Sequence, residues 1–196
     1  MKIFRVDRSL DADFSAVSRA LERDEAPQPD ILPVRLMPDS SLLLKGDPVF
    51  LPEFARGWHF MAVPVFRVGR LGKFIAPKYA WRYIDGVCAG AVLMPPGEVR
   101  SDLACCFDSA AALSPWVKPE ELPAGDFMLQ IGDKILHIDT AQMHIEETVA
   151  LLSRFSTLRT GDIIIPCLTP LTVPAEIGLY AALALVNASV RRLRVK

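Results

Sequence analysis

The sequence lacks the features that are typical of membrane-spanning, secreted or strongly charged proteins. No apolar run approaches the ~18 residues that a membrane-spanning helix needs, and no apolar segment of a signal peptide follows residues 1–10. Neither sign of charge is in excess, because 22 Lys and Arg stand against 23 Asp and Glu, which gives a net charge of −1. We therefore expect a soluble, cytoplasmic protein with no general affinity for nucleic acid or for an anionic membrane.

Cysteine is also scarce, and its four copies show no recognisable ligand spacing. They are Cys88, Cys105, Cys106 and Cys167, with no C-x-x-C pair among them. Adjacent cysteines such as Cys105 and Cys106 rarely form a disulfide with each other. The pattern predicts reduced thiols rather than a disulfide framework or a zinc site.

What is present indicates a single globular domain. The chain has 196 residues, of which 51% are hydrophobic, and this is enough for one sizeable core spanning residues 1–196. The 16 prolines and 11 glycines predict many short elements joined by sharp turns. Helical spacing of apolar residues predicts three helices, over Asp11–Glu22, Ile75–Ile84 and Glu146–Phe155.

Strand patterns outnumber the helical ones. The clearest strand is Trp58–Val68, which is rich in aromatic and branched residues. Pro64 removes one ladder donor from it, so we expect this strand to lie at a sheet edge or to carry a bulge. The sequence therefore predicts an α+β domain that is rich in β-strands. Further strands are expected at Met1–Val6, Ile31–Leu36, Val87–Met94 and Asp162–Ile165. Two hairpins are expected as well, Phe127–Ile131 with Lys134–Ile138 and Ile177–Val186 with Val190–Val195.

Several short segments, in order, resemble the fumarylacetoacetate hydrolase family, and its shorter bacterial members most of all. The similarity covers residues 31–178 well, while the N-terminal strand and helix in residues 1–30 match weakly. The order and spacing of the pieces carry the resemblance more than any one of them does. They are Pro38–Leu43, Phe50–Pro52, Leu71–Lys73, Ala80–Gly90, Phe107–Ala110 and Thr160–Ile164.

This resemblance implies a mixed β-roll of the family's C-terminal-domain type, in which strands wrap around a pocket. Family members use Mg²⁺ or Mn²⁺ to hold 2-oxo or β-dicarbonyl acids, which they hydrolyse, isomerise or decarboxylate. A Glu-x-Glu pair on one strand and an Asp on its neighbour supply carboxylate oxygens to this hard cation, whose charge polarises the enolate oxygens of the substrate.

The chain departs from the family pattern at each of these positions. The two Glu positions fall on Met61 and Val63, the Asp position on Val92, and the family's catalytic lysine on Cys105. Neither a thioether nor an aliphatic side chain replaces a carboxylate at Mg²⁺. The resemblance therefore implies a scaffold with no metal cofactor and no metal-dependent catalysis, its former site filled with apolar side chains.

Four further residues are candidates for the same pocket: His59, Cys106, Asp108 and Thr169. Cys105 could act as a nucleophile with His59 or His137 as its base and Asp108 to orient that base. The alternative is that Cys105 and Cys106 are small buried side chains, as cysteines usually are. Thr169 lies where the family has a Gly-Thr-Pro turn, which is altered here.

Three functions remain open. The first is a non-catalytic protein that acts as a binding module or partner subunit, as a homodimer or in a heteromer with an active paralogue. The second is a hydrolase, isomerase or decarboxylase of small oxo-acids with a rebuilt active site. The third is a purely structural protein that keeps only the association surface.

Overall fold

The computed structural model describes residues 1–7, 14–23, 31, 33–43, 45–97, 103, 105–122, 126–139, 143–167, 172–185 and 190–196. Its larger sheet has the strand order β2-β1-β8-β3-β4-β5, with β9 added beside β3. Only the β1–β8 pair is parallel, so this sheet is mixed. The strands of the larger sheet are β1 (Ile3–Asp7), β2 (Val34–Met37), β3 (His59–Val68), β4 (Ile84–Met94), β5 (Ala111–Leu113), β8 (Ile163–Cys167) and β9 (Thr172–Pro174).

A smaller antiparallel sheet and a few helices complete the domain. The smaller sheet has the order β11-β10-β6-β7, and the strands are β6 (Asp126–Ile131), β7 (Lys134–Asp139), β10 (Tyr180–Leu185) and β11 (Arg191–Arg194). The α-helices are α1 (Phe14–Glu22) and α2 (Ile145–Phe155), and the 3₁₀ helices are η1 (Asp39–Ser41), η2 (Pro77–Tyr83) and η4 (Pro119–Glu121). No helix in the described part of the chain is both long and apolar enough to cross a membrane.

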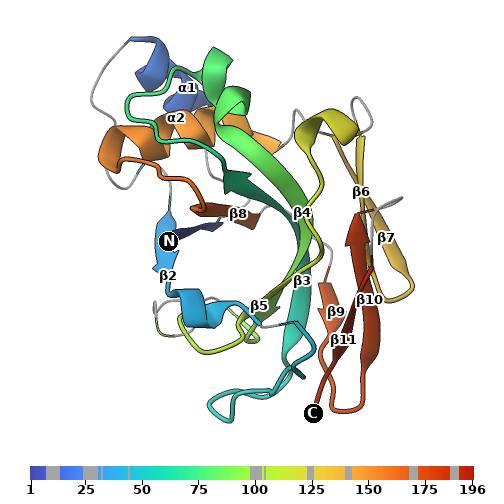
Figure 1. The fold of residues 1–196 in the computed structure, drawn as a ribbon. Coiled ribbons are helices and arrows are strands. Elements are labelled where there is room, and N and C mark those ends of the chain that lie inside the picture. Colours follow the sequence, from blue (N-terminus) through green and yellow to red (C-terminus); the bar gives the residue numbers. More distant parts are fainter. Residues whose placement is uncertain are drawn as a thin grey trace.

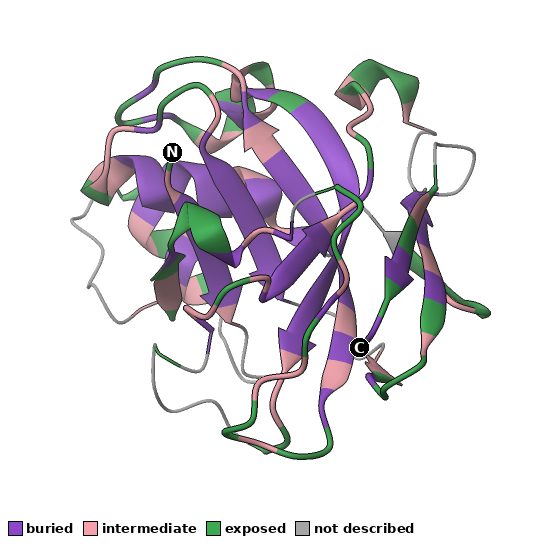
Figure 2. Cartoon of the chain, turned by 60° about the horizontal axis from the view of Figure 1, so that its bottom comes forward, coloured by how far each residue is buried: buried purple, intermediate pink, exposed green. Residues whose placement is uncertain are grey.

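The larger sheet curls into a half-barrel, with the smaller sheet beside β3 and β4 and with α1 and α2 across one end (Figure 1). Residues of β3 alternate between its two faces, because successive side chains of a strand point to opposite sides. Phe60, Ala62 and Phe66 join the cluster shared with the smaller sheet and the helices. Val63 and Val65 face the inside of the curl. The strands of the larger sheet are therefore buried along most of their length (Figure 2).

The β-rich α+β fold predicted from the sequence is confirmed, including the roll and the three helices. The third predicted helix, Ile75–Ile84, is the shorter 3₁₀ helix η2, and Ile84 already belongs to β4. Both predicted hairpins are present as β6–β7 and β10–β11.

Pro64 does not lie at a sheet edge, because β3 has partner strands on both sides. On one side β3 pairs with β4 along its whole length. On the other side it pairs with β9 through His59–Met61 and with β8 through Phe66 and Arg67. Pro64 lies between these two segments, where a missing N–H donor is tolerated. The register of β3 against β4 also shifts, but between Arg67 and Val68.

The turn before β8 is held by a buried carboxylate. Asp162 is 1% exposed and its Oδ1 accepts a hydrogen bond of 2.8 Å from the Lys2 backbone N–H. Its Oδ2 accepts one of 2.9 Å from the Arg159 N–H and lies 2.9 Å from Lys2 Nζ. Burial alone would raise the pKa of Asp162, but the hydrogen bonds from Lys2 and Arg159 outweigh it and hold that pKa below its usual value.

We expect Asp162→Asn to lower the free energy of unfolding at pH 7 by about 1 to 3 kcal/mol, since hydrogen bonds to a charged acceptor are lost. A carboxyl whose pKa is lower in the folded state stabilises the fold fully above its unfolded pKa of about 3.9 and loses this effect as the pH falls through the folded value. Urea unfolding at pH 7 and at pH 3 should therefore show a smaller gap between wild type and variant at pH 3. An equal gap at both pH values would contradict this role.

Candidate functional site

The concave face of the curled sheet brings together three of the four positions that the family resemblance singled out. Met61 of β3 is the register partner of Val92 of β4, and Val63 is the partner of Gly90. Met61, Val63 and Val92 belong to one apolar cluster, which also contains Ile3, Met37, Val65, Cys88, Ala110, Ala111, Ile163, Ile165 and Cys167. We call the space that this cluster lines the roll interior.

The roll interior is tightly packed at its floor and more open at one end. Val63 and Val92 are 0% exposed, whereas Met61 and Met94 are partly exposed. A Cβ at Gly90 would lie only 2.5 Å from Val65 Cγ2 and 3.0 Å from Val63 Cγ2. The floor therefore leaves no room for a larger side chain, and the partly exposed Met61 and Met94 mark the end nearer to solvent.

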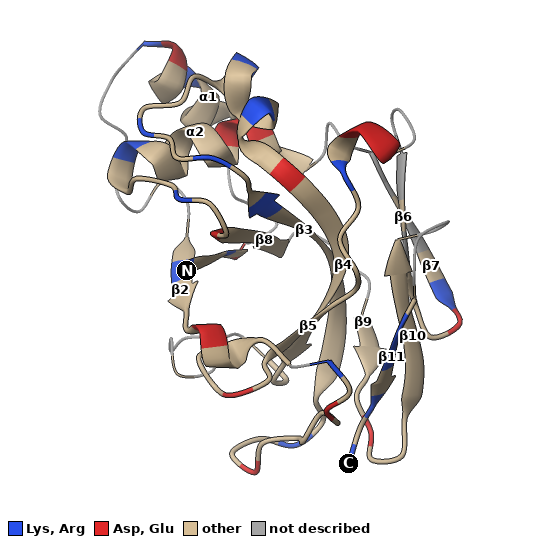
Figure 3. Cartoon of the chain, in the orientation of Figure 1, with Lys and Arg blue, Asp and Glu red and all other residues tan. Residues whose placement is uncertain are grey.

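The side chains at these positions do not fit the divalent ion that the resemblance implies. Mg²⁺ and Mn²⁺ select carboxylate, carbonyl and water oxygens, while Met61, Val63 and Val92 carry no oxygen in their side chains. Charged residues are rare along this wall, since β3, β4 and β5 contain only Arg67 and Asp85 (Figure 3). Among the described residues, no three His, Cys, Asp or Glu side chains form a group suited to a metal ion.

The roll interior does contain a fixed cation, which sequence reasoning missed. Arg5 of β1 is 0% exposed and lies on the same face of its strand as Ile3. Its Nε donates to Asp7 Oδ1 at 2.6 Å, and its Nη2 lies 3.0 Å from Met94 Sδ. Within the described part of the chain, Arg5 Nη1 has no hydrogen-bond partner. The signal was the alternation of β1, which puts Arg5 and Asp7 on the face of a buried apolar residue.

Asp7 bridges this cation to a second one. Arg35 of β2 is the register partner of Arg5, and its Nε lies 2.9 Å from Asp7 Oδ2. The side chains of Asp7 and Arg35 are 21% and 19% exposed, so this end of the cluster lies nearer to solvent than Arg5 does. The carboxylate of Asp7 thus forms ion pairs with two guanidinium groups.

The cysteines beside this cluster are buried thiols. Cys167 is the register partner of Asp7, and burial raises the pKa of Cys167 to about 12. Burial also raises the pKa of Cys105, although the charge of Arg5 opposes the rise. Cys88 is fully buried and its pKa is likewise raised by burial. At neutral pH these groups are thiols, which are weak nucleophiles.

The remaining predicted pocket residues are more dispersed. His59 is half-buried on β3, opposite Met94 on one side and Pro174 on the other. Cys106 is partly exposed and its Sγ donates to the Leu36 carbonyl at 3.3 Å. Asp108 is exposed, and His137, the other proposed base, lies on β7 in the smaller sheet. Thr169 lies outside the described residues.

Alkylation tests whether Cys105 is a buried thiol or an activated nucleophile. At pH 7.5 we expect iodoacetamide to modify Cys106 first in the native protein. Cys167 should react about a thousandfold more slowly than an unperturbed cysteine, because the thiolate fraction falls tenfold for each unit by which its pKa rises. Cys105 should also be protected until the chain unfolds. Peptide mapping reports each site, and a Cys106→Ser variant confirms the assignment. Native Cys105 that reacts faster than free cysteine would identify an activated nucleophile instead.

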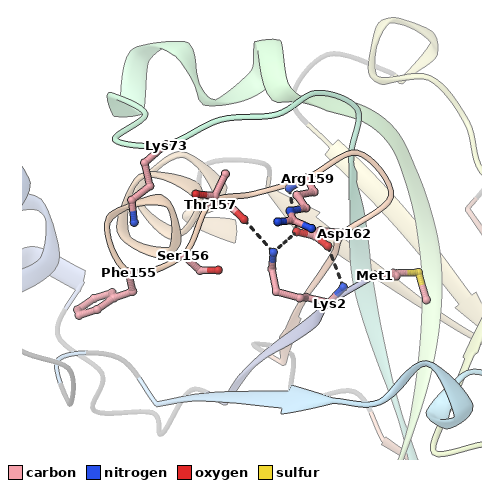
Figure 4. Close-up of a pocket in the computed structure, with 8 residues that line it drawn as sticks. All are labelled: Met1, Lys2, Lys73, Phe155, Ser156, Thr157, Arg159 and Asp162. Carbon is pink, nitrogen blue, oxygen red and sulfur yellow. Dashed lines mark hydrogen bonds and ion pairs between the residues drawn. The ribbon is translucent and has the colours of Figure 1, made fainter.

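A hollow of about 470 Å³ lies at the C-terminal end of α2 (Figure 4). Two of its charged side chains already have structural partners. Lys2 Nζ contacts Asp162 and donates to the Thr157 carbonyl at 2.8 Å, and Lys73 Nζ donates to the Arg154 carbonyl at 2.8 Å. None of the predicted site residues lines this hollow, and the contacts of these two lysines are best explained as part of the fold.

Comparison with known proteins agrees with this geometry. The profile of the fumarylacetoacetate (FAA) hydrolase C-terminal family matches residues 2–166. No curated protein sequence matches the chain. One similar solved structure is the 5-carboxymethyl-2-hydroxymuconate delta-isomerase of Mycobacterium smegmatis, with 20% identity and a TM-score of 0.76 over 99% of this chain and 76% of that one.

Two hydrolases show the same fold. The fumarylpyruvate hydrolase of Pseudomonas aeruginosa, solved with Mn²⁺ and pyruvate, has 20% identity and a TM-score of 0.73, and the match covers 100% of this chain and 89% of that one. The maleylpyruvate hydrolase of Sphingobium sp. SYK-6 has 20% identity and a TM-score of 0.76, with 99% and 70% covered. From the family match over most of its length, the chain belongs to the fumarylacetoacetate hydrolase family.

Proposed function

We propose that this chain is a catalytically inactive member of its family that acts as a binding or partner subunit. The observation that carries the proposal is the pairing of Met61 with Val92, beside Val63, on the concave face where the family resemblance places metal ligands. These three side chains offer no donor to Mg²⁺ or Mn²⁺.

The electrostatics of the roll interior support the same proposal. Arg5 contacts Met94, which lies two residues from Val92 on the same face of β4. A divalent cation entering this region would meet the positive charge of Arg5, and the repulsion would be strong in an environment of low dielectric. This repulsion, which the carboxylate of Asp7 partly offsets, disfavours a metal ion beside Arg5.

The alternative is a hydrolase, isomerase or decarboxylase of small 2-oxo or β-dicarbonyl acids with rebuilt chemistry. Similar folds include such enzymes, as the two hydrolases and the isomerase illustrate. A mechanism based on Cys105 has little support, because burial raises the pKa of that thiol. The two proposed bases lie in different sheets, His59 on β3 and His137 on β7, and Asp108 is exposed.

Thermal unfolding and turnover test the proposal together. An ion that binds the native state raises the melting temperature, and the rise increases with the ratio of ion concentration to dissociation constant. We expect no rise with Mg²⁺ or Mn²⁺ after EDTA treatment, and no turnover of acylpyruvates or oxaloacetate. A saturable rise accompanied by turnover would favour the enzyme.

The partner role needs its own experiment. The chain would form a homodimer, or a heteromer with a paralogue that retains the Glu-x-Glu pair. Affinity purification at native expression levels should recover that paralogue if the heteromer exists. Recovery of a homodimer alone would argue against a silent partner subunit and leave the binding role.

A further inference from the structure

We infer that the hollow at the C-terminal end of α2 binds a small phosphate monoester, whose phosphate group contacts Lys73 and Arg159 and whose organic part lies against Phe155. The hollow has a volume of about 470 Å³, within the usual range of small-ligand pockets. It shares no lining residue with the roll interior. The inference therefore goes beyond the proposed function and does not depend on it.

The first reason is the charge of the lining. Among the described residues that line the hollow, three are cations (Lys2, Lys73 and Arg159) and one is an acid, Asp162. Lys2 Nζ lies 2.9 Å from Asp162 Oδ2, so these two charges balance each other. Lys73 and Arg159 form no ion pair with any described carboxylate. A phosphate monoester, which carries close to two negative charges at neutral pH, would balance both cations.

The second reason is the set of hydrogen-bond donors that remain available. Lys73 donates one N–H to a carbonyl of α2, which leaves two. Within the described ranges, Arg159 uses only its backbone N–H, and its guanidinium group makes no hydrogen bond. In Figure 4 the hydroxyl side chains of Ser156 and Thr157 lie between Lys73 and Arg159. Ammonium, guanidinium and hydroxyl donors together suit the acceptor oxygens of a phosphate group.

The end of α2 would by itself repel an anion, because the last carbonyl groups of a helix carry partial negative charge. Two lysines offset this effect. Lys73 Nζ donates to the Arg154 carbonyl and Lys2 Nζ to the Thr157 carbonyl, each at 2.8 Å. The carbonyl groups at this end of α2 are therefore covered by positive charge.

Phe155 supplies a surface for the organic part of the ligand. It is the last residue of α2, it lines the hollow, and its side chain is 52% exposed. Contact with an aromatic ring would remove apolar surface of both groups from water. The ligand class that fits the hollow is therefore a phosphate attached to an apolar or aromatic group.

Isothermal titration calorimetry at low ionic strength tests the inference with phenyl phosphate as the probe. Wild type should bind it, and should bind phenyl sulfate at least about fivefold more weakly, because a sulfate ester carries one negative charge. Arg159→Gln should lose about tenfold in affinity for phenyl phosphate, since a hydrogen bond from a charged donor is removed. The matched control is Arg82→Gln, which removes an exposed guanidinium group outside the hollow and should not weaken binding.

The Arg159 variant separates binding from folding. The backbone N–H of Arg159, which donates to Asp162, remains when the side chain is changed, so the melting temperature should stay close to that of wild type. Phe155→Ala should weaken the binding of phenyl phosphate severalfold and leave that of inorganic phosphate unchanged.

Four results would overturn the inference. Wild type might show no saturable binding of phenyl phosphate, or Arg159→Gln and Arg82→Gln might bind it equally well. Equal affinity of wild type for phenyl phosphate and phenyl sulfate would exclude a site built for a dianion. An equal effect of Phe155→Ala on phenyl phosphate and inorganic phosphate would exclude the contact with the organic part. The proposed function would stand in each case, because no residue of the roll interior is changed.

Discussion

Replacing Val63 with glutamate is expected to lower the free energy of unfolding at pH 7 by about 3 to 5 kcal/mol. Val63 is 0% exposed and packs within an apolar cluster. If a divalent ion occupied this place, the new carboxylate would coordinate it and its charge would be balanced. Without one, the side chain must either bury an unpaired charge or take up a proton.

The pH dependence identifies the cause of this loss. A buried glutamate has a raised pKa in the folded state. Below its unfolded pKa of about 4.3 the group is neutral in both states, so the penalty is small there and grows as the pH rises toward the folded value. Urea unfolding at pH 4 and pH 7 should show this trend for Val63→Glu and not for the uncharged control Val63→Gln. Equal stability of both variants at pH 7 would contradict the account.

Replacing Asp7 with asparagine is expected to cost about 2 to 4 kcal/mol, because it leaves the buried guanidinium of Arg5 without its counter-ion. Asp7 Oδ1 lies 2.6 Å from Arg5 Nε, and Asp7 also holds Arg35. The partial exposure of the Asp7 side chain moderates the loss, since solvent screens part of the charge.

A double-mutant cycle assigns this loss to Arg5. Removing both partners of a buried ion pair often changes the stability little, whereas removing one leaves the other charge buried and unpaired. The variant Arg5→Met/Asp7→Asn should therefore recover most of the stability lost in Asp7→Asn. Chemical denaturation of the wild type, the two single variants and the double variant supplies the cycle. If the double variant were as unstable as Asp7→Asn, Arg5 would not be the group whose charge Asp7 balances.

Much of the fold follows from local sequence because its main strands are long and regular. The aromatic and branched residues of Trp58–Val68 predicted a strand there, and the segments Phe127–Ile131 and Lys134–Ile138 predicted a hairpin. The short strands β5 and β9 have three residues each and no pattern of their own, since pairing with β4 and β3 defines them. The position of Pro64 between two partners of β3 is a tertiary fact, invisible along the chain.

The candidate site could likewise be predicted only in part. The family resemblance implied that Met61, Val63 and Val92 would lie at one site, and the register places Met61 opposite Val92. The contact of Arg5 with Met94 could not be predicted, because it spans 89 residues of sequence. From the sequence alone, an arginine in a short N-terminal strand is expected to lie in solvent. In the structure, parallel pairing with β8 and the curl of the sheet bury it.

The most direct test of the central claim, that the roll interior holds a guanidinium rather than a divalent ion, is a Mn²⁺ titration of protein labelled at its methionine methyl groups. Met61 and Met94 flank the interior, and Met61→Leu and Met94→Leu assign their NMR signals. Bound Mn²⁺ broadens nearby signals beyond detection. We predict that both signals persist at one equivalent of Mn²⁺ per chain. Their selective loss at that ratio would show an ion in the roll interior and contradict the account.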